Sequence, residues 1–466
     1  MPDRRKWLAI TNWRDLEHEQ SGGAELVCQQ LAARFAAAGE RVVLLTAAVP
    51  GRPRRERRDG YLIVRGGGRF TVYLWALVWL FAHRRRVDTV LDSQNGIPFF
   101  TPLAVRRSTV VTLLLHHVHQ NQFALYFPRP VAALGRFLES SVSRIVYGER
   151  TLIAVSPSTK QGARRELRLR GDIKVIPPGW QVSLDVDAVP VARTVHPTIV
   201  SVGRLVPHKR THLTIEALPA LRAMHPGLVL HVVGGGAKLD ELRTLVSVLD
   251  LEDSVVFHPD CSDGVRDGLL ASAWLSVNAS EGEGWGISVI ESNALGTPVL
   301  AYNRPGLRDS ISPGVNGWLI GDDVALSDGI SDALRELEDE QLAAGLRTSS
   351  LAWAAQFTWD EMGRRVLDVM SDERTRLRLA HRNRRRHVDV STVVHIPDAL
   401  VPHGWQPLLR TNDSVTRDRD GLTLFLSGAD TVDSSEVLLR LGFPASIPLD
   451  DIDFRVARRR DHLLFR

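Results

Sequence analysis

A run of acidic residues and glycines, EGEGWGISVIE over residues 281–291, has the composition of a ligand-binding turn that opens a helix. Glu283 precedes the turn, and Glu291 is expected two turns into the following helix. Gly284 and Gly286 would bring backbone N–H groups to the helix mouth, where they suit a sugar hydroxyl or a phosphate oxygen. Two carboxylates there can accept paired hydrogen bonds from vicinal hydroxyl groups. The alternative is a solvated helix face.

Two cations, Arg204 and Lys209, follow the end of a predicted strand in the segment SVGRLVPHK, residues 201–209. A guanidinium fork and an ammonium group in a loop at this place could clamp a diphosphate. They would also stabilise the charge that develops when a bond to that diphosphate breaks. The alternative is two surface cations in a loop.

Gly22 and Gly23, in the segment SGGAE at residues 21–25, mark the expected start of the first helix. Free backbone N–H groups and the positive end of a helix make an anion site, and glycines let a phosphate approach closely. A tight strand-to-helix turn would have the same sequence. The segment lacks the GxGxxG spacing, which weakens a dinucleotide interpretation.

Three histidines, His116, His117 and His119, follow the predicted strand at residues 110–115. If the strand persists, His117 and His119 share one face and His116 points the other way. A zinc site would need a Cys, Asp or Glu nearby, and the segment supplies none. The preferred interpretation is a histidine that forms hydrogen bonds in a cleft, with at least one of the three purely structural.

The composition is that of a globular chain. Of its 466 residues, 44% are hydrophobic and 24% charged, which argues against a disordered or a multispan membrane protein. At about 150 residues per domain, the length predicts three domains, or two large ones with an appendage. The two cysteines, Cys28 and Cys261, cannot form a disulfide framework, so a reducing cytoplasm is expected.

The net charge of +4 conceals clusters of arginine. Such clusters suit phosphate-bearing ligands or anionic membrane surfaces, although each one alone could be a solvated face. A nucleic-acid interpretation rests on these clusters only and lacks the interleaved aromatic residues that stack on bases. The clusters are residues 52–58, 84–86 and 164–170, and seven arginines between residues 374 and 386.

An apolar segment over residues 70–82, FTVYLWALVWLFA, is followed by His83 and three arginines. Its thirteen residues fall short of the ~20 that span a bilayer. We therefore expect a buried or interfacial helix, with burial in the core favoured over contact with a membrane. The apolar run at residues 7–10 is too short for a signal peptide.

Apolar strand-like runs alternate with helix-length segments through most of the chain. This alternation predicts an α/β architecture with parallel sheets, in two Rossmann-like halves that face each other across a cleft. A polar stretch around Pro190 and Pro197 is the expected linker. The expected strands are 7–11, 42–46, 62–65, 89–92, 110–115, 152–155, 173–176, 198–202, 228–233, 255–258, 275–278 and 298–302, and the expected helices are 24–38, 212–224, 238–249, 264–273 and 287–295.

Five segments together resemble the retaining glycosyltransferases of family 4, which have the GT-B fold: SGGAE, GRLVPHK, VVGGG, EGWGISVIE and PGLRDSISPGVNGWL. The resemblance covers residues 7–370, and the seven residues between Glu283 and Glu291 are its most specific feature. The chain would then consist of an acceptor-side domain (1–185), a donor domain (197–355), a helix packing back toward the first domain (356–372) and an α+β extension of unknown role (373–466).

The resemblance also implies a role for each motif. Arg204 and Lys209 would bind the donor diphosphate, and Glu291 would hold the ribose hydroxyls. Glu283 would contact the transferred sugar together with a histidine, for which His119 is placed first and His117 second. The remaining assignments are Gly22 and Gly23 facing the phosphate or the acceptor, Gly234 to Gly236 lining the nucleotide pocket, and Gly284, Trp285 and Gly286 in the donor site.

Two positions depart from the family's pattern. Gln120 follows His119 where Asp or Glu is common, and Arg210 follows Lys209 where Gly is common. Neither removes a charge that the chemistry needs, but the geometry of the donor is expected to differ.

The implied reaction transfers a sugar from a nucleoside diphosphate donor, foremost a UDP- or GDP-sugar, to an acceptor hydroxyl with the anomeric configuration retained. The acceptor is left open between a lipid-linked glycan, a polysaccharide and a secondary metabolite. No DxD motif lies beside the donor site, because Asp450, Asp451 and Asp453 fall in the extension, so neither a catalytic metal nor a cofactor is expected.

We expect a cytoplasmic protein with peripheral contact at the inner face of the membrane. Two alternatives stay open. One is a nucleotide-sugar epimerase of the same fold, although the EGWG turn does not supply an acid and a base that flank a sugar ring. The other is a non-catalytic transferase-like scaffold, although Arg204, Lys209 and Glu291 are all present.

Overall fold

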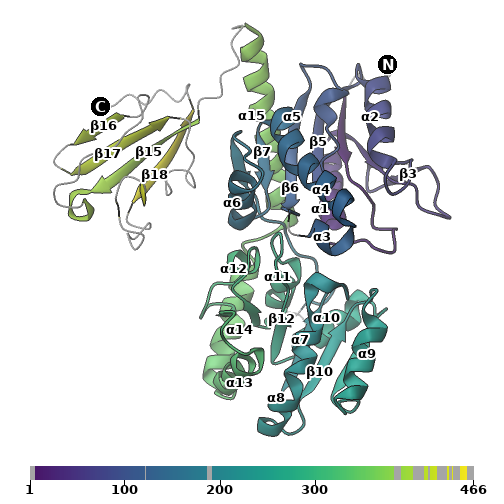
Figure 1. Cartoon of the computed structure of the whole chain (residues 1–466), viewed down its shortest axis with the longest axis vertical. Helices are drawn as coiled ribbons and strands as arrows, with labels where there is room; N and C mark the ends of the chain where they lie inside the picture. The colour runs from purple at the N-terminus through teal and green to yellow at the C-terminus, as the bar shows by residue number, and fades with distance from the viewer. Residues whose placement is uncertain are drawn as a thin grey trace.

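The computed structural model describes residues 6–120, 122–148, 150–185, 191–382, 390–401, 414–417, 420–427, 438–439, 443 and 452–458. Two α/β domains lie one above the other, and a smaller antiparallel sheet follows at the C-terminal end (Figure 1). The two Rossmann-like halves that the alternation of strands and helices predicts are both present.

The first domain is built on an eight-stranded sheet in the order β3-β4-β2-β1-β5-β6-β7-β8. Every pairing is parallel except that of β3 with β4. Its inner strands are buried on both faces, which explains their continuous apolar sequence. The strands are β1 (Trp7–Thr11), β2 (Arg41–Thr46), β3 (Arg55–Arg58), β4 (Tyr61–Arg65), β5 (Val87–Asn95), β6 (Val110–His117), β7 (Leu152–Ala154) and β8 (Ile173–Val175).

Helices cover both faces of this sheet. Residues of α1 and of the late helix α15 (Trp359–Arg382) pack on one face, and residues of α2, α5 and α6 pack on the other. The helical segments of the domain are α1 (Gly23–Ala37), α2 (Val72–His83), the 3₁₀ turn η1 (Thr101–Leu103), α3 (Phe123–Tyr126), α4 (Arg129–Phe137), the π-helical turn η2 (Leu138–Val142), α5 (Ser143–Tyr147) and α6 (Pro157–Arg165).

The arginine cluster at residues 52–58 is not an open anion site. It contains the edge strand β3, which the sequence analysis missed, and its side chains pair with carboxylates. Arg52 and Arg58 both contact Glu17 at 2.5 Å. Glu56, within the cluster, accepts from Arg58 at 2.7 Å. Glu56 lies on β3 itself, and Glu17 lies more than thirty residues earlier in the chain. The run of arginines alone did not show that these carboxylates neutralise it.

The second domain has a six-stranded parallel sheet in the order β11-β10-β9-β12-β13-β14. The strands are β9 (Thr198–Val202), β10 (Val229–Val233), β11 (Val255–His258), β12 (Leu275–Asn278), β13 (Val299–Tyr302) and β14 (Gly317–Ile320). Its helical segments are η3 (Pro207–Lys209), α7 (Thr211–Glu216), α8 (Leu218–Met224), α9 (Leu239–Val248), α10 (Asp263–Ser272), α11 (Ile287–Ala294), α12 (Leu307–Ser310), α13 (Leu326–Leu337) and α14 (Glu340–Ala354).

The helix expected over residues 212–224 is broken into α7 and α8. Pro219 lies in the first turn of α8, where its missing N–H costs nothing, whereas inside one continuous helix it would remove a hydrogen bond.

Helix α15 returns the chain to the first domain. Its Arg365 donates to the carbonyl of Val175 at 2.8 Å, and its Glu373 accepts from the hydroxyl of Thr151 at 2.8 Å. The helix runs to Arg382, ten residues past the expected end at 372. Thr358 caps its start, because the Thr358 hydroxyl accepts from the N–H of Glu361 at 3.1 Å.

The chain crosses between the domains twice, and the two crossings touch. A Cβ atom added to Gly179 would lie 2.3 Å from the backbone nitrogen of Trp359, so only glycine fits there. The indole of Trp180 donates to the carbonyl of Ala354 at 2.8 Å. The segment that leaves the first domain is thus held against the segment that returns to it.

The C-terminal extension contains a sheet in the order β16-β17-β15-β18, with its own apolar core. The elements are β15 (Val390–Pro397), the 3₁₀ turn η4 (Asp398–Leu400), β16 (Ser414–Arg417), β17 (Gly421–Ser427) and β18 (Asp453–Arg458). The apolar runs at 391–395 and 422–426 lie inside β15 and β17. Asp450 and Asp451 lie outside the described residues, as do 383–386 of the last arginine cluster.

The apolar segment at residues 70–82 forms most of α2, which is packed against the first sheet on one side. Within the described part of the chain, no helix has both the length and the apolar character needed to cross a membrane.

Candidate active site

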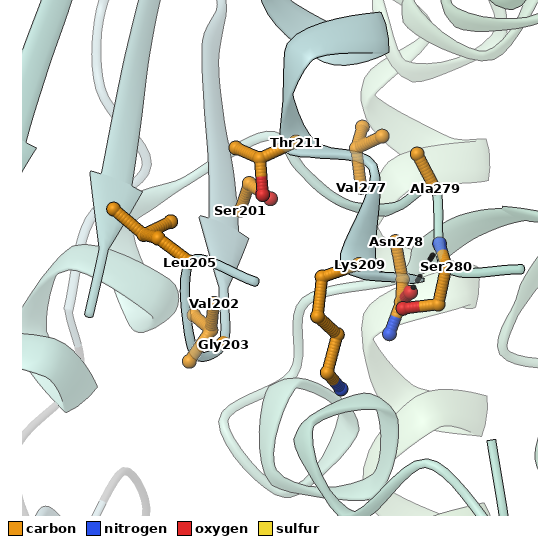
Figure 2. A pocket seen from close by; sticks show the side chains of 10 residues that line it. All are labelled: Ser201, Val202, Gly203, Leu205, Lys209, Thr211, Val277, Asn278, Ala279 and Ser280. Atoms are coloured by element: carbon orange, nitrogen blue, oxygen red, sulfur yellow. Dashed lines mark hydrogen bonds between the residues drawn. The ribbon is translucent and has the colours of Figure 1, made fainter. Parts of the chain in front are cut away.

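The candidate site lies at the carboxyl ends of β9 and β12, the point where the strand order of the second sheet reverses. Open α/β sheets bind ligands at such switch points. A pocket is present here, and Figure 2 shows Lys209 extended between the Gly203 turn and the strand end at Asn278. The pocket is lined by Ser201, Val202, Gly203, Leu205, Lys209, Thr211, Val277, Asn278, Ala279 and Ser280.

Lys209 and Glu283 form an ion pair beside this pocket. The Lys209 ammonium lies 2.5 Å from Oε1 of Glu283, and the Ser280 hydroxyl donates to the same oxygen at 2.7 Å. Burial opposes ionisation of Glu283, but Lys209 and Ser280 outweigh it and hold the pKa of this carboxyl below its usual value. Glu283 is therefore a carboxylate at neutral pH, available as an acceptor of hydrogen bonds but not as an acid.

Arg210 has a left-handed backbone, with φ of +50°, directly after Lys209. This conformation explains why glycine is common at the position in the family. Arg210 is held in it by two contacts: its Nε donates to the carbonyl of Ala279 at 2.8 Å, and its guanidinium lies 5.0 Å from the centre of the Tyr302 ring. The loop that carries Lys209 is thereby tied to the end of β12.

Glu291 lies on α11 and is 7% exposed. The helix begins at Ile287, so Glu291 is just over one turn into it and not two turns as expected. Burial raises the pKa of Glu291 to about 7, although the Arg266 guanidinium opposes that shift. Asp263 and Asp267 act in the same direction as burial. Near neutral pH this carboxyl therefore titrates.

The glycines of the turn are required by close contacts. A Cβ on Gly284 would lie 1.9 Å from the carbonyl oxygen of His116, which brings the turn of the second domain against the end of β6. Gly286 has φ of +94° and precedes the first residue of α11. Their predicted contacts with a donor stay predictions.

The side chain of Trp285 is buried in the apolar core, with its ring 5.0 Å from that of Phe357. The ring therefore packs the turn in place, and contact of this residue with a donor, which would have to involve its backbone, stays a prediction.

The start of α1 approaches the second domain across the cleft. A Cβ on Gly22 would lie 3.3 Å from Nε of Arg204, and one on Gly23 would lie 3.2 Å from a methyl group of Ile287. The N–H of Gly22 donates to Glu25 at 2.8 Å, while Gly22 itself precedes the helix. The structure thus brings together the predicted glycines, Arg204 and the first residue of α11.

Arg14 is a buried cation of this region that the sequence analysis missed. Its side chain is 4% exposed, and its Nε lies 3.4 Å from the Glu25 carboxylate without forming a hydrogen bond. Burial lowers the pKa of Arg14, as does the nearby Arg204. A single arginine shortly after the first strand carries no motif, so only the fold could reveal its place.

Gly234 serves the packing of the pocket's rim. It has φ of +121°, and a Cβ there would lie 2.3 Å from the carbonyl oxygen of Gly203. The turn after β10 therefore rests directly on the turn after β9. The glycines at 234–236 border the pocket through this contact, but they are not among the residues that line it.

The three histidines have different surroundings, because β6 ends at His117 and the alternation assumed through His119 does not hold. His116 is buried and hydrogen-bonded to Ser93 at 2.8 Å, a structural role. His117 bonds Gln122 at 3.1 Å and faces the Glu283 turn. Burial lowers the pKa of His117 to about 3, so it is neutral at physiological pH.

His119 is held by Glu139, which the sequence analysis did not single out. Glu139 is fully buried in the π-helical turn η2. Its carboxylate accepts from the backbone N–H of His119 at 2.7 Å and from the side chain of Gln120 at 2.6 Å. Gln120, the first departure from the family's pattern, thus has a partner of its own.

One side-chain contact joins the domains at the mouth of the cleft. The hydroxyl of Tyr126, on α3, lies 2.5 Å from Nδ1 of His208, the neighbour of Lys209. Burial lowers the pKa of His208 to about 4, and the adjacent Lys209 contributes to the shift. Among the described residues, no group of three or more His, Cys, Asp or Glu side chains is arranged to hold a metal ion.

Two Rossmann-like domains that face each other across a cleft are the architecture of the GT-B class. Comparison with known proteins gives the same class. The family model described as Glycosyltransferase Family 4 matches residues 21–183, and that described as Glycosyl transferases group 1 matches residues 187–349. The chain belongs to the family 4 type of glycosyltransferases and has the GT-B fold.

Curated relatives carry several activities. A D-inositol 3-phosphate glycosyltransferase of Acidothermus cellulolyticus is 30% identical over 254 residues, which are 49% of this chain and 56% of that protein. A GDP-mannose-dependent alpha-(1-6)-phosphatidylinositol monomannoside mannosyltransferase of Mycobacterium tuberculosis is 29% identical over 37% of this chain and 47% of its own length. The matches span about half the length of these relatives.

Solved structures show the same fold. Sucrose-phosphate synthase from Thermosynechococcus elongatus aligns with a TM-score of 0.65 and 21% identity, over 79% of this chain and 99% of that chain. Anabaena HepE in complex with UDP and glucose aligns with a TM-score of 0.59 and 17% identity, over 79% and 100% of the two chains.

Proposed function

We propose that the protein is a retaining glycosyltransferase that moves a hexose from a nucleoside diphosphate sugar to an acceptor hydroxyl. The observation that carries this proposal is the convergence of cations and carboxylates on one cleft. Lys209 and Arg204 lie on the second domain, and Arg204 reaches the glycines at the start of α1 on the first. Glu283 and Glu291 flank the turn between them.

In the proposed reaction, the acceptor oxygen bonds to the anomeric carbon on the face from which the diphosphate leaves. The bond from that carbon to the diphosphate oxygen breaks, and the leaving phosphate takes the proton of the acceptor hydroxyl. Arg204 and Lys209 stabilise the charge on the diphosphate. Glu283 is ionised, so it holds hydroxyl groups of the transferred sugar and donates no proton.

Glu291 would bind the ribose hydroxyls, and the two cations would supply the positive charge at the diphosphate without a metal ion. UDP- and GDP-sugars are the foremost donors. One relative is named as GDP-mannose-dependent, and a structure with the same fold contains UDP and glucose. We place the protein in the cytoplasm with peripheral contact to the membrane, and the acceptor is a lipid-linked glycan, a polysaccharide or a secondary metabolite.

A thermal-shift titration against UDP, GDP, ADP and TDP tests donor binding. A ligand at 100 times its Kd adds ~2.7 kcal/mol to the free energy of unfolding. We expect one diphosphate to raise Tm equally with and without magnesium. The matching nucleotide sugars are then incubated with candidate acceptors, and NMR of the product reads the anomeric configuration. No change in Tm with any of the four diphosphates would favour the non-catalytic scaffold. Conversion of the nucleotide sugar to an isomer in the absence of an acceptor would favour an epimerase.

Replacing Glu139 by glutamine tests whether it positions His119. The amide would put an N–H donor in place of one carboxylate oxygen, opposite the donor of either His119 or Gln120, so the His119–Gln120 loop should shift. We expect kcat to fall about tenfold, because small misplacements at a reacting centre are costly, with the donor KM unchanged. A fall in Tm with normal kcat would show a purely structural role. Glu216→Gln, on an exposed carboxyl at the end of α7 in the second domain, is the control.

A further inference from the structure

The helix α2 has apolar side chains on two opposite sides. Val72, Ala76 and Leu80 are buried against the first sheet. On the other side, Leu74, Val78 and Phe81 form a stripe that Phe70, just before the helix, extends, and these four side chains are between 55% and 68% exposed. A helix that is apolar all round is normally buried all round, so this outer stripe lacks a covering surface among the described residues.

The stripe continues onto neighbouring segments of the same domain. Tyr73 of α2 contacts Phe99 with ring centres 4.6 Å apart, and Phe100 contacts Tyr147 of α5 at 6.4 Å. Arg69, just before α2, lies 5.8 Å from the ring of Phe127 at the end of α3. These contacts pack α2, residues 97–109 and α3–α5 side by side, and we call the exposed side chains of these segments together the basic apolar face. Its further exposed apolar side chains include Leu103, Leu125, Val131, Leu134, Phe137 and Ile145.

The charge on the basic apolar face has one sign. Residues 68–87, 97–109 and 122–148 contain nine arginines, all exposed, and a single acidic residue, Glu139, which is fully buried. The whole chain nearly balances its charges, with 58 Lys and Arg against 54 Asp and Glu, so these segments stand apart from the rest. The arginines are Arg69, Arg84, Arg85, Arg86, Arg106, Arg107, Arg129, Arg136 and Arg144.

We propose that the basic apolar face docks on an anionic lipid bilayer. Apolar side chains such as Leu74, Val78 and Phe81 would enter the boundary between headgroups and acyl chains, and the arginines would lie among the phosphates. Exposed apolar residues explain adhesion to a bilayer, and the one-signed charge selects anionic lipids. A second copy of the chain is a poor occupant, because it would present the same positive face.

The basic apolar face borders the cleft. Tyr126 belongs to α3 on this face, and its hydroxyl contacts His208 beside Lys209. A bilayer under the face would therefore bring lipid headgroups to the mouth of the cleft. The inference that the acceptor hydroxyl belongs to a lipid-linked molecule rests on the proposed function, whereas the docking itself does not.

Flotation of the full chain with vesicles tests the docking. We expect the protein to float with phosphatidylcholine vesicles that contain about one third phosphatidylglycerol and not with phosphatidylcholine alone. Raising the salt from about 0.1 M to about 1 M shortens the Debye length from ~10 Å to ~3 Å and should release most of the protein. The triple variant Leu74→Ser, Val78→Ser and Phe81→Ser should bind at least about tenfold more weakly, because it loses three inserted side chains.

The controls separate this proposal from the proposed function. Val248→Ser with Leu342→Ser removes exposed apolar side chains from the second domain and should leave flotation unchanged. The nucleoside diphosphate that stabilises the wild type should stabilise the triple variant to the same extent. Three results would overturn the docking proposal, whatever the result with nucleotides. The wild type could fail to float, or the control variant could lose flotation as much as the triple variant does. The triple variant could also change from dimer to monomer while no protein binds vesicles.

Discussion

Replacing Lys209 by alanine is expected to lower kcat/KM by ~10²-fold or more, because the leaving diphosphate loses a cation. The variant should also be less stable. Lys209 is the ion-pair partner of Glu283, and removal of the ammonium leaves that largely buried carboxylate with only the Ser280 hydroxyl as a side-chain partner. An uncompensated buried charge is costly. Steady-state kinetics and thermal unfolding of the same preparation measure the two effects.

A double variant separates catalysis from stability. Adding Glu283→Gln to Lys209→Ala removes the unpaired charge, so Tm should recover while kcat/KM stays low. Lys238→Ala is the matched control, because it breaks an exposed lysine–glutamate pair on α9 and should change neither quantity. Near-normal turnover of Lys209→Ala would contradict the assignment of the diphosphate site, and recovery of activity in the double variant would show that Lys209 acts only through Glu283.

Donor affinity is expected to rise about tenfold between pH 6 and pH 8 if Glu291 binds the ribose. Burial raises the pKa of Glu291 to about 7, so about a tenth of the free protein has this carboxylate ionised at pH 6 and about nine tenths at pH 8. Only the carboxylate accepts from both ribose hydroxyls, so the donor must displace the proton at low pH. The affinity should level off above the pKa. Kd for the intact nucleotide sugar across this range measures the effect, because a free diphosphate has a terminal phosphate that titrates in the same range.

The same carboxyl affects folding with the opposite sign. Its pKa in the folded protein lies above the unfolded value of ~4.3, so the folded state binds the proton more tightly, and this contribution to stability is lost as pH rises from about 4 through 7.

Glu291→Gln has no carboxylate to accept from the ribose hydroxyls, so it should bind the donor ~10²-fold more weakly and without the pH dependence. Glu241→Gln, on the exposed side of α9, should keep the wild-type profile. A wild-type pH profile in Glu291→Gln would remove Glu291 from the donor site.

The architecture was predictable because apolar runs of strand length alternate with helix-length segments, and the parallel strands are buried on both faces. The motifs carry glycines and charges at strand ends, which a doubly wound fold gathers at one edge. Arg204, Lys209, Glu283 and Glu291 were singled out from sequence. The structure pairs Lys209 with Glu283 and sets Arg204 beside the start of α1, and the roles of all four toward a donor stay predictions.

What sequence could not supply are contacts between distant segments. Glu139 reaches His119 only because η2 widens the helix by a π turn, and Arg14 borders the cleft only because α1 begins beside it. Which of the three histidines share a face of the strand depends on where β6 ends, and no residue type marks that boundary. Trp285 lies in a predicted binding motif, yet its ring is buried in the core. The ring packs there against Phe357, a residue distant in sequence, so the motif alone did not reveal its direction.

The contact between the two chain crossings has a mechanical consequence. Because Gly179 rests on the backbone of Trp359, the two connections between the domains are tied together at one point. We expect any change in the angle between the domains to be centred on this contact, because sliding of one domain past the other would break it. Such a change would also have to separate Tyr126 from His208, whose side chains join the two domains.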